Sequence, residues 1–202
     1  MSAFVDRALS ELLDDVAAQS PSPGGGGCAA WACAMGAGLA EMAASFTLAR
    51  PRYADVHERM AAIRVQAGEL RSRACELAEH DSEGYAPVLA ALQLPPGHPE
   101  RAQRLADALS AAAETPLAAA EVAAAVAELA AEVARTGNAH LTGDAVTGAL
   151  LAEAACRAAS RLVEINLAGR TGDPRLERLA EAVSRAGAAR DEALRPRDES
   201  SG

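Results

Sequence analysis

The alternation of apolar and polar positions is clearest between residues 116 and 136. On a helical projection of 100° per residue, the large apolar side chains fall within about 60° of one another; they are Val122, Val126, Leu129 and Val133. Glutamates form a narrow polar stripe roughly 100° away, made up of Glu121, Glu128 and Glu132. This pattern predicts an α-helix with its apolar face in a core.

Proline, glycine and short polar runs divide the rest of the chain into similar segments. In the fifth segment, Thr115 is the expected N-cap and Pro116 the first helical residue. The short connections favour antiparallel packing of neighbouring helices. We predict an all-α fold, a multi-helix antiparallel bundle of about seven helices. The helices are expected over residues 2–18, 26–49, 53–92, 99–113, 116–136, 143–168 and 174–194.

The abundance of alanine bears on assembly. Small side chains let helix axes approach toward the low end of the usual ~8–10 Å. They also bury little apolar area, and burial contributes only about 25 cal/mol per Å². Such a bundle needs extensive helix contact, and a second subunit is the expected source. We predict a homodimer of a single all-helical domain over residues 1–194, followed by a disordered polar tail at 195–202.

Composition excludes several classes of protein. Aromatic residues make up only 2% of the 202 residues. Alanine favours helices, whereas strands favour β-branched and aromatic side chains, so an all-β fold is excluded. All 19 basic residues are arginine, which rules out a Schiff-base lysine and the lysine of a phosphate-binding loop. The net charge of −9 argues against binding to nucleic acid.

The sequence also carries expectations about location and metals. No stretch reaches ~18 consecutive apolar residues, so no membrane span is expected. The N-terminal residues are acidic and amphipathic, unlike a secretion signal, and we expect a cytoplasmic protein. We expect no metal and four buried, reduced thiols, because the cysteine spacing suits neither a zinc site nor a disulfide scaffold. The cysteines are Cys28, Cys33, Cys75 and Cys156.

Four consecutive glycines, Gly24, Gly25, Gly26 and Gly27, follow a Pro-Ser-Pro sequence and open the second predicted helix. Glycine weakens a helix but lets the backbone approach another group closely. At a helix N-terminus, such a loop presents free N–H groups and the positive end of the helix dipole, which suits an anionic or carbonyl-bearing ligand. The alternative is a flexible turn beside a tight helix crossing, a crossing that glycines at 36 and 38 also suggest.

A polar cluster at residues 79–85 lies inside the long third predicted helix and includes His80, Asp81 and Tyr85. Because four residues separate Asp81 from Tyr85, the two lie on one helix face. A histidine beside carboxylates is a candidate general base. A solvated, charged turn is the alternative interpretation.

Two other polar residues are separated by the length of a helix. Asp144 begins the sixth predicted helix, where an acid caps the first turn. Asn166 follows 22 residues later, about 33 Å along an α-helix, so the two cannot share one pocket within a subunit unless the helix breaks. Arg50 and Arg52 follow the second predicted helix; such a pair either clamps a carboxylate or complements the helix C-terminus.

Taken together, these segments resemble the cyclodeaminase/cyclohydrolase family. This family comprises the C-terminal domain of formiminotransferase-cyclodeaminase and stand-alone methenyltetrahydrofolate cyclohydrolases. The resemblance covers roughly residues 4–169. Its motifs, in chain order, are Ser22 to Gly26, Arg50 to Tyr53, Asp81 with Tyr85, Pro116, Gly137-Asn138, Asp144, Leu150 to Ala155, and Ile165-Asn166-Leu167.

The resemblance implies an all-helical homodimer that handles one-carbon units on tetrahydrofolate. Family members either cyclise 5-formiminotetrahydrofolate with loss of ammonia or hydrolyse 5,10-methenyltetrahydrofolate to 10-formyltetrahydrofolate. No metal or redox cofactor is required for either reaction. The implied partners are therefore a small-molecule folate derivative and a second copy of the chain, with no nucleic acid and no membrane.

The residues can be assigned roles in such chemistry. The methenyl bridge is an amidinium-like cation, which a nearby carboxylate stabilises. We expect Asp81 to be the catalytic group, with Asp144 as second choice and His80 as another proton acceptor. The expected substrate-binding residues are Gly24, Gly25, Gly26, Gly27, Tyr85, Arg50, Arg52, Asn138 and Asn166, with the two arginines holding the glutamate tail.

The chain departs from the family pattern at polar positions. Gly27 stands where the family usually has serine, and Leu162 replaces a polar residue four positions before Asn166. These departures keep two alternatives open. One is a divergent enzyme acting on another imine, amidine or cyclic amide in a specialised pathway. The other is a non-catalytic helical dimer that serves as a binding module.

Overall fold

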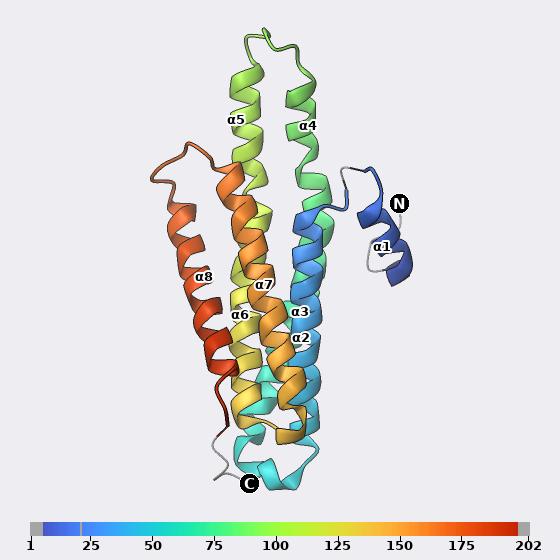
Figure 1. Ribbon diagram of the computed structural model, residues 1–202, viewed down its shortest axis with the longest axis vertical. Coiled ribbons are helices and arrows are strands. Elements are labelled where there is room, and N and C mark those ends of the chain that lie inside the picture. The colour runs from blue at the N-terminus through green and yellow to red at the C-terminus, as the bar shows by residue number, and fades with distance from the viewer. Residues whose placement is uncertain (1–5, 21, 198–202) are drawn as a thin grey trace.

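The computed structural model describes residues 6–20 and 22–197, and their regular structure is entirely helical (Figure 1). The all-α prediction is confirmed. The α-helices are α1 (Leu9–Ala17), α2 (Gly25–Leu48), α3 (His57–Gly84), α4 (Ala86–Gln93), α5 (Arg101–Ala112), α6 (Glu114–Thr136), α7 (Thr142–Asn166) and α8 (Pro174–Ala193). Two 3-10 helices, η2 (Pro51–Val56) and η3 (Ala139–Leu141), lie in the connections at one end of the bundle.

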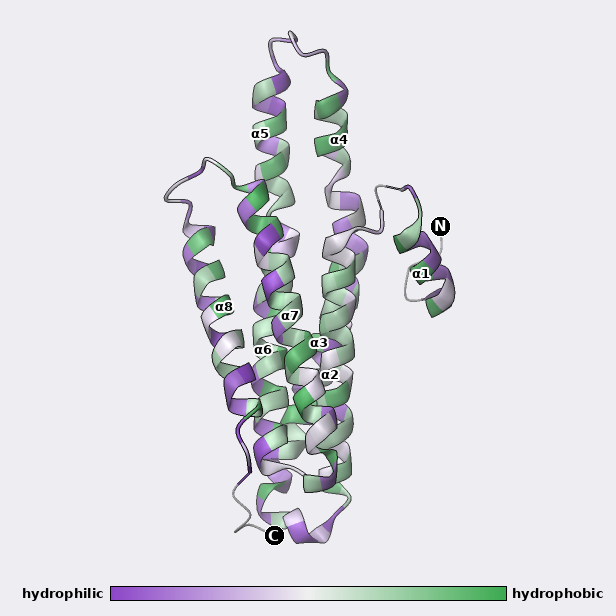
Figure 2. Ribbon diagram, in the orientation of Figure 1, coloured by the Kyte–Doolittle hydropathy of each residue, from purple (hydrophilic) through white to green (hydrophobic). Residues whose placement is uncertain are grey.

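The long helices α2, α3, α6 and α7 lie side by side along the long axis, and α8 packs against α6 and α7 (Figure 1). Helices α4 and α5 form a hairpin that extends beyond one end of this bundle, and α1 lies to the side of α2. Coloured by hydropathy, α1 and α8 alternate between polar and apolar residues (Figure 2), as helices with one solvent face do. Within the described residues, no single helix is both long and apolar enough to cross a membrane.

Small side chains bring α2 and α7 into close contact. A Cβ atom added at Gly36 would lie 2.7 Å from the Gly148 carbonyl oxygen, so only glycine fits this backbone separation. The tight crossing predicted at Gly36 is confirmed, whereas Gly38 only faces the end of the Arg71 side chain, 3.6 Å away. Around this crossing the core is mainly alanine, with a few large, fully buried side chains such as Met60, Ile63, Leu117 and Val126.

The faces predicted for α6 are present. Val126, Leu129 and Val133 are buried, and the fourth predicted residue, Val122, is partly buried against the core. The glutamate stripe, however, does not simply face solvent, because each glutamate pairs with an arginine of a neighbouring helix. The ion pairs are Glu121–Arg178 and Glu128–Arg185 to α8, and Glu132–Arg59 to α3.

The prediction of one helix over residues 53–92 is wrong. The chain forms η2 and then α3, the regular helix is interrupted at Tyr85 (φ −90°, ψ −12°), and the chain continues as α4 with Pro87 in its first turn. Proline has no backbone N–H and clashes with the carbonyl four residues earlier, so Pro87 is compatible with a new helix but not with continuation of α3. The polar cluster at 79–85 therefore lies at a helix end, not inside a helix.

The prediction that Thr115 caps a helix beginning at Pro116 is also wrong. Helix α6 begins at Glu114, and Ala113, with φ −78° and ψ −19°, is the single residue between α5 and α6. Because Ala113 keeps a helical conformation, the two helices are nearly continuous. Pro116 is tolerated in the first turn of α6, where backbone N–H groups have few intrahelical partners.

The ends of the chain differ from the expected pattern as well. The first helix was expected over 2–18, but α1 begins at Leu9 and residues 1–5 lie outside the described part. Of the predicted disordered tail, residues 198–202 are also outside it. Arg197 is not free: its guanidinium donates to the carbonyl oxygens of Ala134 and Gly137, at 3.2 and 2.9 Å.

Candidate active site

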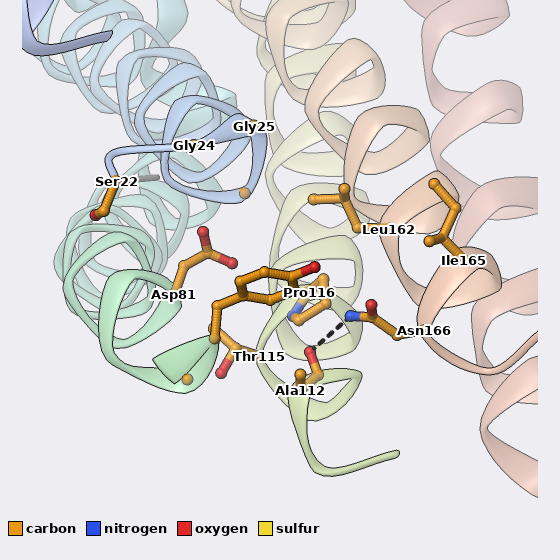
Figure 3. Close-up of a pocket in the computed structure, with 13 residues that line it drawn as sticks. Ser22, Gly24, Gly25, Asp81, Ala112, Thr115, Pro116, Leu162, Ile165 and Asn166 are labelled. Carbon is orange, nitrogen blue, oxygen red and sulfur yellow. Dashed lines mark hydrogen bonds between the residues drawn. The ribbon is translucent and has the colours of Figure 1, made fainter. Parts of the chain in front are cut away.

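A cavity of about 230 Å³ lies at the end of the bundle where α2 begins (Figure 3). It is bounded by the glycine loop, the α3–α4 turn, the α5–α6 junction and the last two turns of α7. Four segments far apart in the sequence thus meet at one place. The lining residues are Ser22, Gly24, Gly25, Gly26, Asp81, Gly84, Tyr85, Ala112, Thr115, Pro116, Leu162, Ile165 and Asn166.

The Asp81 carboxylate is held against the N-terminus of α2. The backbone N–H of Gly27 donates a hydrogen bond to Asp81 Oδ2 at 3.0 Å. A Cβ atom built on Gly26 would overlap this carboxylate, so position 26 must lack a side chain for the contact to exist. The glycine loop therefore has a specific physical purpose: it lets a helix N-terminus approach an acid closely.

Burial raises the pKa of Asp81 above the ordinary value for aspartate, and the hydrogen bond from Gly27 partly opposes this rise. The half-buried Cys28 thiol lies within the electrostatic influence of this group. Burial, and then the Asp81 charge, raise the pKa of the Cys28 thiol, so the thiol stays protonated at neutral pH. Of this pair, Asp81 is therefore the stronger acid.

Two other polar side chains reach the cavity. Tyr85 is placed there because α3 ends at Gly84, and 42% of its side chain surface remains exposed. Asn166 comes from the last turn of α7, and its Nδ2 donates to the Ala112 carbonyl oxygen at 3.0 Å (Figure 3). Leu162 and Ile165 supply an apolar wall beside it. The cavity therefore combines a carboxylate, an amide, a phenol and backbone N–H groups with apolar surface, a combination suited to a polar heterocycle.

Several residues expected to act together are indeed brought together. Gly24, Gly25, Gly26, Asp81, Tyr85 and Asn166 all line the cavity. Gly27 lies behind it and contributes its N–H to Asp81. His80 is exposed on α3 and is not part of the lining, so the expectation that it acts as a proton acceptor in this cavity does not fit the geometry.

The other expected site residues lie at the opposite end of the bundle. Helix α2 has 24 residues, about 36 Å of α-helix, which separates Arg50 and Arg52 from the cavity. Within one chain these arginines cannot hold the tail of a ligand bound there. The guanidinium of Arg52 instead lies 4.7 Å from the ring centre of Tyr53. Asp144 lies in the first turn of α7, whereas Asn166 ends that helix at the cavity. Asp144 is therefore also separated from the cavity by the length of a helix.

Asn138 also belongs to that distant end, where it serves a local structural purpose. Its backbone N–H donates to the buried Thr47 hydroxyl at 2.8 Å, and its side-chain oxygen accepts from the His140 N–H at 3.1 Å. These bonds fix the connection between α6 and α7. The expectation that Asn138 binds substrate therefore does not fit the cavity of its own chain.

Some cavity residues carried little signal in the sequence. Ala112, Thr115 and Ile165 line the cavity because α5 ends, α6 begins and α7 ends near one another. The sequence offered Thr115 only as a helix cap and Ile165 only as part of a motif. Pro116 was visible as a helix-start residue, but its place in the wall depends on the break between α5 and α6. Among residues 6–20 and 22–197, no group of three or more histidine, cysteine, aspartate or glutamate side chains is placed to hold a metal ion.

Fold and cavity together define a class of protein: an all-helical bundle with a small ligand cavity in which a helix N-terminus made of glycines holds a carboxylate. The family model described as formiminotransferase-cyclodeaminase matches residues 8–185. The chain belongs to this family.

The chain covers its relatives to different extents. A methenyltetrahydrofolate cyclohydrolase of Methylorubrum extorquens is 31% identical and matches 91% of this chain and 92% of its own length. A formimidoyltransferase-cyclodeaminase of Rattus norvegicus is 28% identical over 90% of this chain, which spans only 34% of that protein. Among solved structures, a formiminotetrahydrofolate cyclodeaminase of Thermotoga maritima superposes with a TM-score of 0.84 at 31% identity, covering 94% of this chain and 95% of its own.

Proposed function

We propose that this protein is an enzyme of one-carbon folate metabolism that hydrolyses 5,10-methenyltetrahydrofolate to 10-formyltetrahydrofolate. The observation that carries the proposal is the half-buried Asp81 carboxylate, fixed by the Gly27 N–H inside the cavity. A relative matched over almost its whole length is named for this reaction, which supports the same assignment here. The chain's glycine loop, Asp81, Tyr85 and Asn166 meet in one cavity, which agrees with a single reaction centre.

The carboxylate has two tasks in this mechanism. The methenyl carbon lies between two nitrogens that share a positive charge, and the half-buried Asp81 carboxylate offsets this charge. Asp81 then accepts a proton from a water molecule as the water oxygen bonds to the methenyl carbon. The raised pKa of Asp81 suits a group that must take up a proton and release it again.

The second half of the reaction returns that proton. The tetrahedral carbon holds a hydroxyl group and both ring nitrogens. Its bond to N5 breaks, the bond electrons go to N5, and N5 takes the proton from Asp81. The hydroxyl proton leaves to solvent as the formyl C=O forms on N10. In sum, the methenyl cation and one water give the formyl product and one proton, and Asp81 is regenerated.

The cavity fits part of a folate. Its volume of about 230 Å³ is below the ~300–1,000 Å³ of sites that enclose drug-sized ligands. The bicyclic ring and the one-carbon bridge therefore occupy it, and the glutamate end of the substrate extends outward past Tyr85 and Ile165, both partly exposed. The free N–H groups of the glycine loop face a ring carbonyl.

Cyclisation of 5-formiminotetrahydrofolate with loss of ammonia is a second candidate, favoured by the close structural similarity to the Thermotoga maritima cyclodeaminase. This reaction needs a proton donor for the departing nitrogen. A carboxyl group whose pKa is raised by burial is protonated more often than an exposed one and meets this need. In this reaction Asp81 first donates a proton, whereas in the hydrolysis it first accepts one.

The direct test measures the loss of methenyltetrahydrofolate absorbance with and without protein, above the uncatalysed rate. Asp81→Asn is expected to lower kcat/KM at least ~10²-fold, because the amide can still accept the Gly27 hydrogen bond but cannot take a proton. Glu83→Gln, which changes an exposed acid outside the cavity, is the matched control. Wild-type activity in Asp81→Asn, or no hydrolysis by the wild-type protein, contradicts the proposal. Formation of methenyltetrahydrofolate from the formimino compound assays the second candidate.

We further propose that the protein is a homodimer and that α2 forms part of its interface. One outer stripe of α2 holds large apolar residues at helical spacing: Met35, Leu39, Met42 and Phe46, of which Met35 and Phe46 are more than half exposed. Glu41 is the one charged residue in this helix sequence. Helices that are apolar on all sides are normally covered on all sides, and a second copy of the same stripe is the complementary surface for a symmetric pair.

Light scattering after size exclusion tests this assembly. The wild-type protein is expected to elute as a dimer at micromolar concentration, and Phe46→Glu as a monomer, because a charge in an apolar interface is strongly unfavourable. Leu194→Glu, at an equally exposed leucine next to α8, is the control and keeps the dimer. A monomeric wild-type protein overturns this proposal without affecting the assignment of the reaction.

A further inference from the structure

The junction between α5 and α6 leaves one backbone carbonyl without its usual partner. In an α-helix, each carbonyl oxygen accepts from the N–H four residues later. For Ala112 that residue is Pro116, which has no N–H to donate. Both residues line the cavity. An unpaired carbonyl at this position needs a donor from elsewhere in the protein.

Asn166 supplies this donor. Its Nδ2 donates to the Ala112 carbonyl oxygen at 3.0 Å, across 54 residues of sequence. A side-chain amide has a donor end and an acceptor end, so this bond decides which end faces the ligand. With Nδ2 directed at Ala112, the remaining polar atom is Oδ1, which Figure 3 shows on the side away from the Ala112 carbonyl. A flipped amide would bring two oxygens together.

We propose that Pro116 is a positioning residue: by leaving the Ala112 carbonyl without a helical donor, it fixes the Asn166 amide so that the cavity presents a carbonyl oxygen rather than an amino group. The site thereby selects ligands that carry N–H donors on the edge facing α7. This inference rests on the proposed function in that it takes the ligand to be a folate. The inference specifies which edge of the folate ring forms hydrogen bonds with Asn166.

The other polar groups of the cavity are compatible with an acceptor oxygen at Asn166. Asp81, across the cavity from Asn166 (Figure 3), faces the one-carbon bridge in the proposed mechanism, and the glycine loop offers N–H donors near it. A ligand that satisfies the set has N–H groups along one edge and a carbonyl on a neighbouring one. A 2-amino-4-oxo pteridine ring has this arrangement, whereas its 2-deamino analogue lacks the amino donors.

The kinetic test compares two substrates in two proteins. Wild-type protein is expected to prefer 5,10-methenyltetrahydrofolate over its 2-deamino analogue by at least ~10²-fold in kcat/KM, because the analogue leaves a fixed acceptor unpaired. Pro116→Ala restores a backbone N–H that competes for the Ala112 carbonyl, so the Asn166 amide is free to rotate. We expect KM to rise about tenfold, kcat to change less than about twofold, and the preference to shrink about tenfold.

A double-mutant cycle separates positioning from general damage. Asn166→Ala is expected to show the same loss of preference as Pro116→Ala, and the double variant no further loss, because Pro116 acts through Asn166. Pro174→Ala, a proline in the first turn of α8 away from the cavity, is the matched control. Additive effects of Pro116→Ala and Asn166→Ala, or an unchanged preference in Pro116→Ala, overturn the inference.

A measurement without substrate keeps this test independent of the reaction. In ¹⁵N-labelled wild-type protein, the Asn166 side-chain NH₂ signal is expected to show a hydrogen-bonded shift and slow exchange with solvent. Both should move toward values of an exposed asparagine in Pro116→Ala. An exposed-type signal in the wild-type protein contradicts the inference whatever the enzyme acts on. A bonded signal together with no turnover contradicts the proposed function alone.

Discussion

Asp81 owes its environment to two glycines and to burial. The Gly27 N–H stabilises the carboxylate, while removal from water favours its protonated form, and burial is the larger effect. The Asp81 carboxyl group is therefore neither fully solvated nor fully buried. Burial makes this carboxyl group easier to protonate than an exposed aspartate.

The pH profile follows from this balance. If Asp81 acts as the base, the active form is the ionised one, whose fraction rises as pH rises through its pKa. Because burial raises the pKa of Asp81, the acid limb of kcat/KM is expected above the ordinary range for aspartate, and activity is lost as pH falls through it. Initial rates, corrected for uncatalysed hydrolysis, measure this limb. Asp81→Asn should lack the limb, and an unchanged profile in that variant argues for another base.

Gly26 should be intolerant of any side chain. In Gly26→Ala, the new Cβ would overlap the Asp81 carboxylate and force it away from the Gly27 N–H. We expect kcat/KM to fall by about 10²-fold with the helical circular dichroism spectrum retained. Gly25→Ala is the comparison, because a Cβ there meets no described atom within 4 Å. Equal losses in the two variants would show that overlap with Asp81 is not the cause.

At the scale of elements, prolines decide where helices end and glycines decide how closely they pack. Pro87 and Pro116 mark the start of α4 and the first turn of α6, and both breaks deliver residues to the cavity. Gly36 and Gly148 set the separation of α2 and α7, which carry the two sides of that cavity. A few glycines, which lack a side chain, and prolines, which lack an N–H group, thus decide which parts of the chain meet at the cavity.

The α2–α7 crossing should be sensitive to a single methyl group. In Gly36→Ala, the Cβ would lie 2.7 Å from the Gly148 carbonyl oxygen, a backbone atom that moves only with its helix. We expect the free energy of unfolding to fall by about 1–3 kcal/mol, measured by chemical denaturation. Gly187→Ala, in α8 with no described atom near its Cβ, should instead gain ~0.5–1 kcal/mol. A stabilised Gly36→Ala protein would contradict the close approach.

At the scale of the molecule, the C-terminal segment closes the end of the bundle opposite the cavity. Arg197 donates to two carbonyls at the α6 terminus and, at 3.3 Å, to the Thr142 hydroxyl at the start of α7. It therefore connects the C-terminal segment to the α6–α7 connection, some 55–63 residues earlier in the chain. This end also holds Asn138 and Asp144, away from the proposed chemistry.

Loss of this contact should affect stability more than loss of a nearby surface pair. Arg197→Ala is expected to lower the free energy of unfolding by about 1 kcal/mol, since it leaves carbonyl groups without a donor. Arg195→Ala removes an exposed pair with Glu192 and should change it by less than ~0.5 kcal/mol. Thermal unfolding of the two variants makes the comparison. Equal melting temperatures would mean that water replaces the Arg197 contacts without loss.

Much of this architecture was determined by the sequence alone. Alanine-rich segments with helical spacing can form little but helices, so the all-α fold followed directly. The expected antiparallel packing of neighbours fails at the one-residue junctions at Tyr85 and Ala113, where the chain continues in nearly the same direction (Figure 1). The glycine run and the four-residue spacing of Asp81 and Tyr85 are local features. They could be identified because they depend only on residues close together in the sequence. The separation of Asp144 from Asn166 also followed, because the length of an unbroken helix depends only on the number of residues.

Tertiary structure decided which of these features share a site. Gly26 and Asp81 are 55 residues apart, and only the packing of α2 on α3 reveals that one must lack a side chain to admit the other. The sequence suggested that Arg50 and Arg52 bind the ligand. The length of α2, however, places them at the end of the bundle opposite the cavity of their own chain. Patterns along a chain report local conformation, whereas the meeting of distant residues depends on where helices break and how closely they pack.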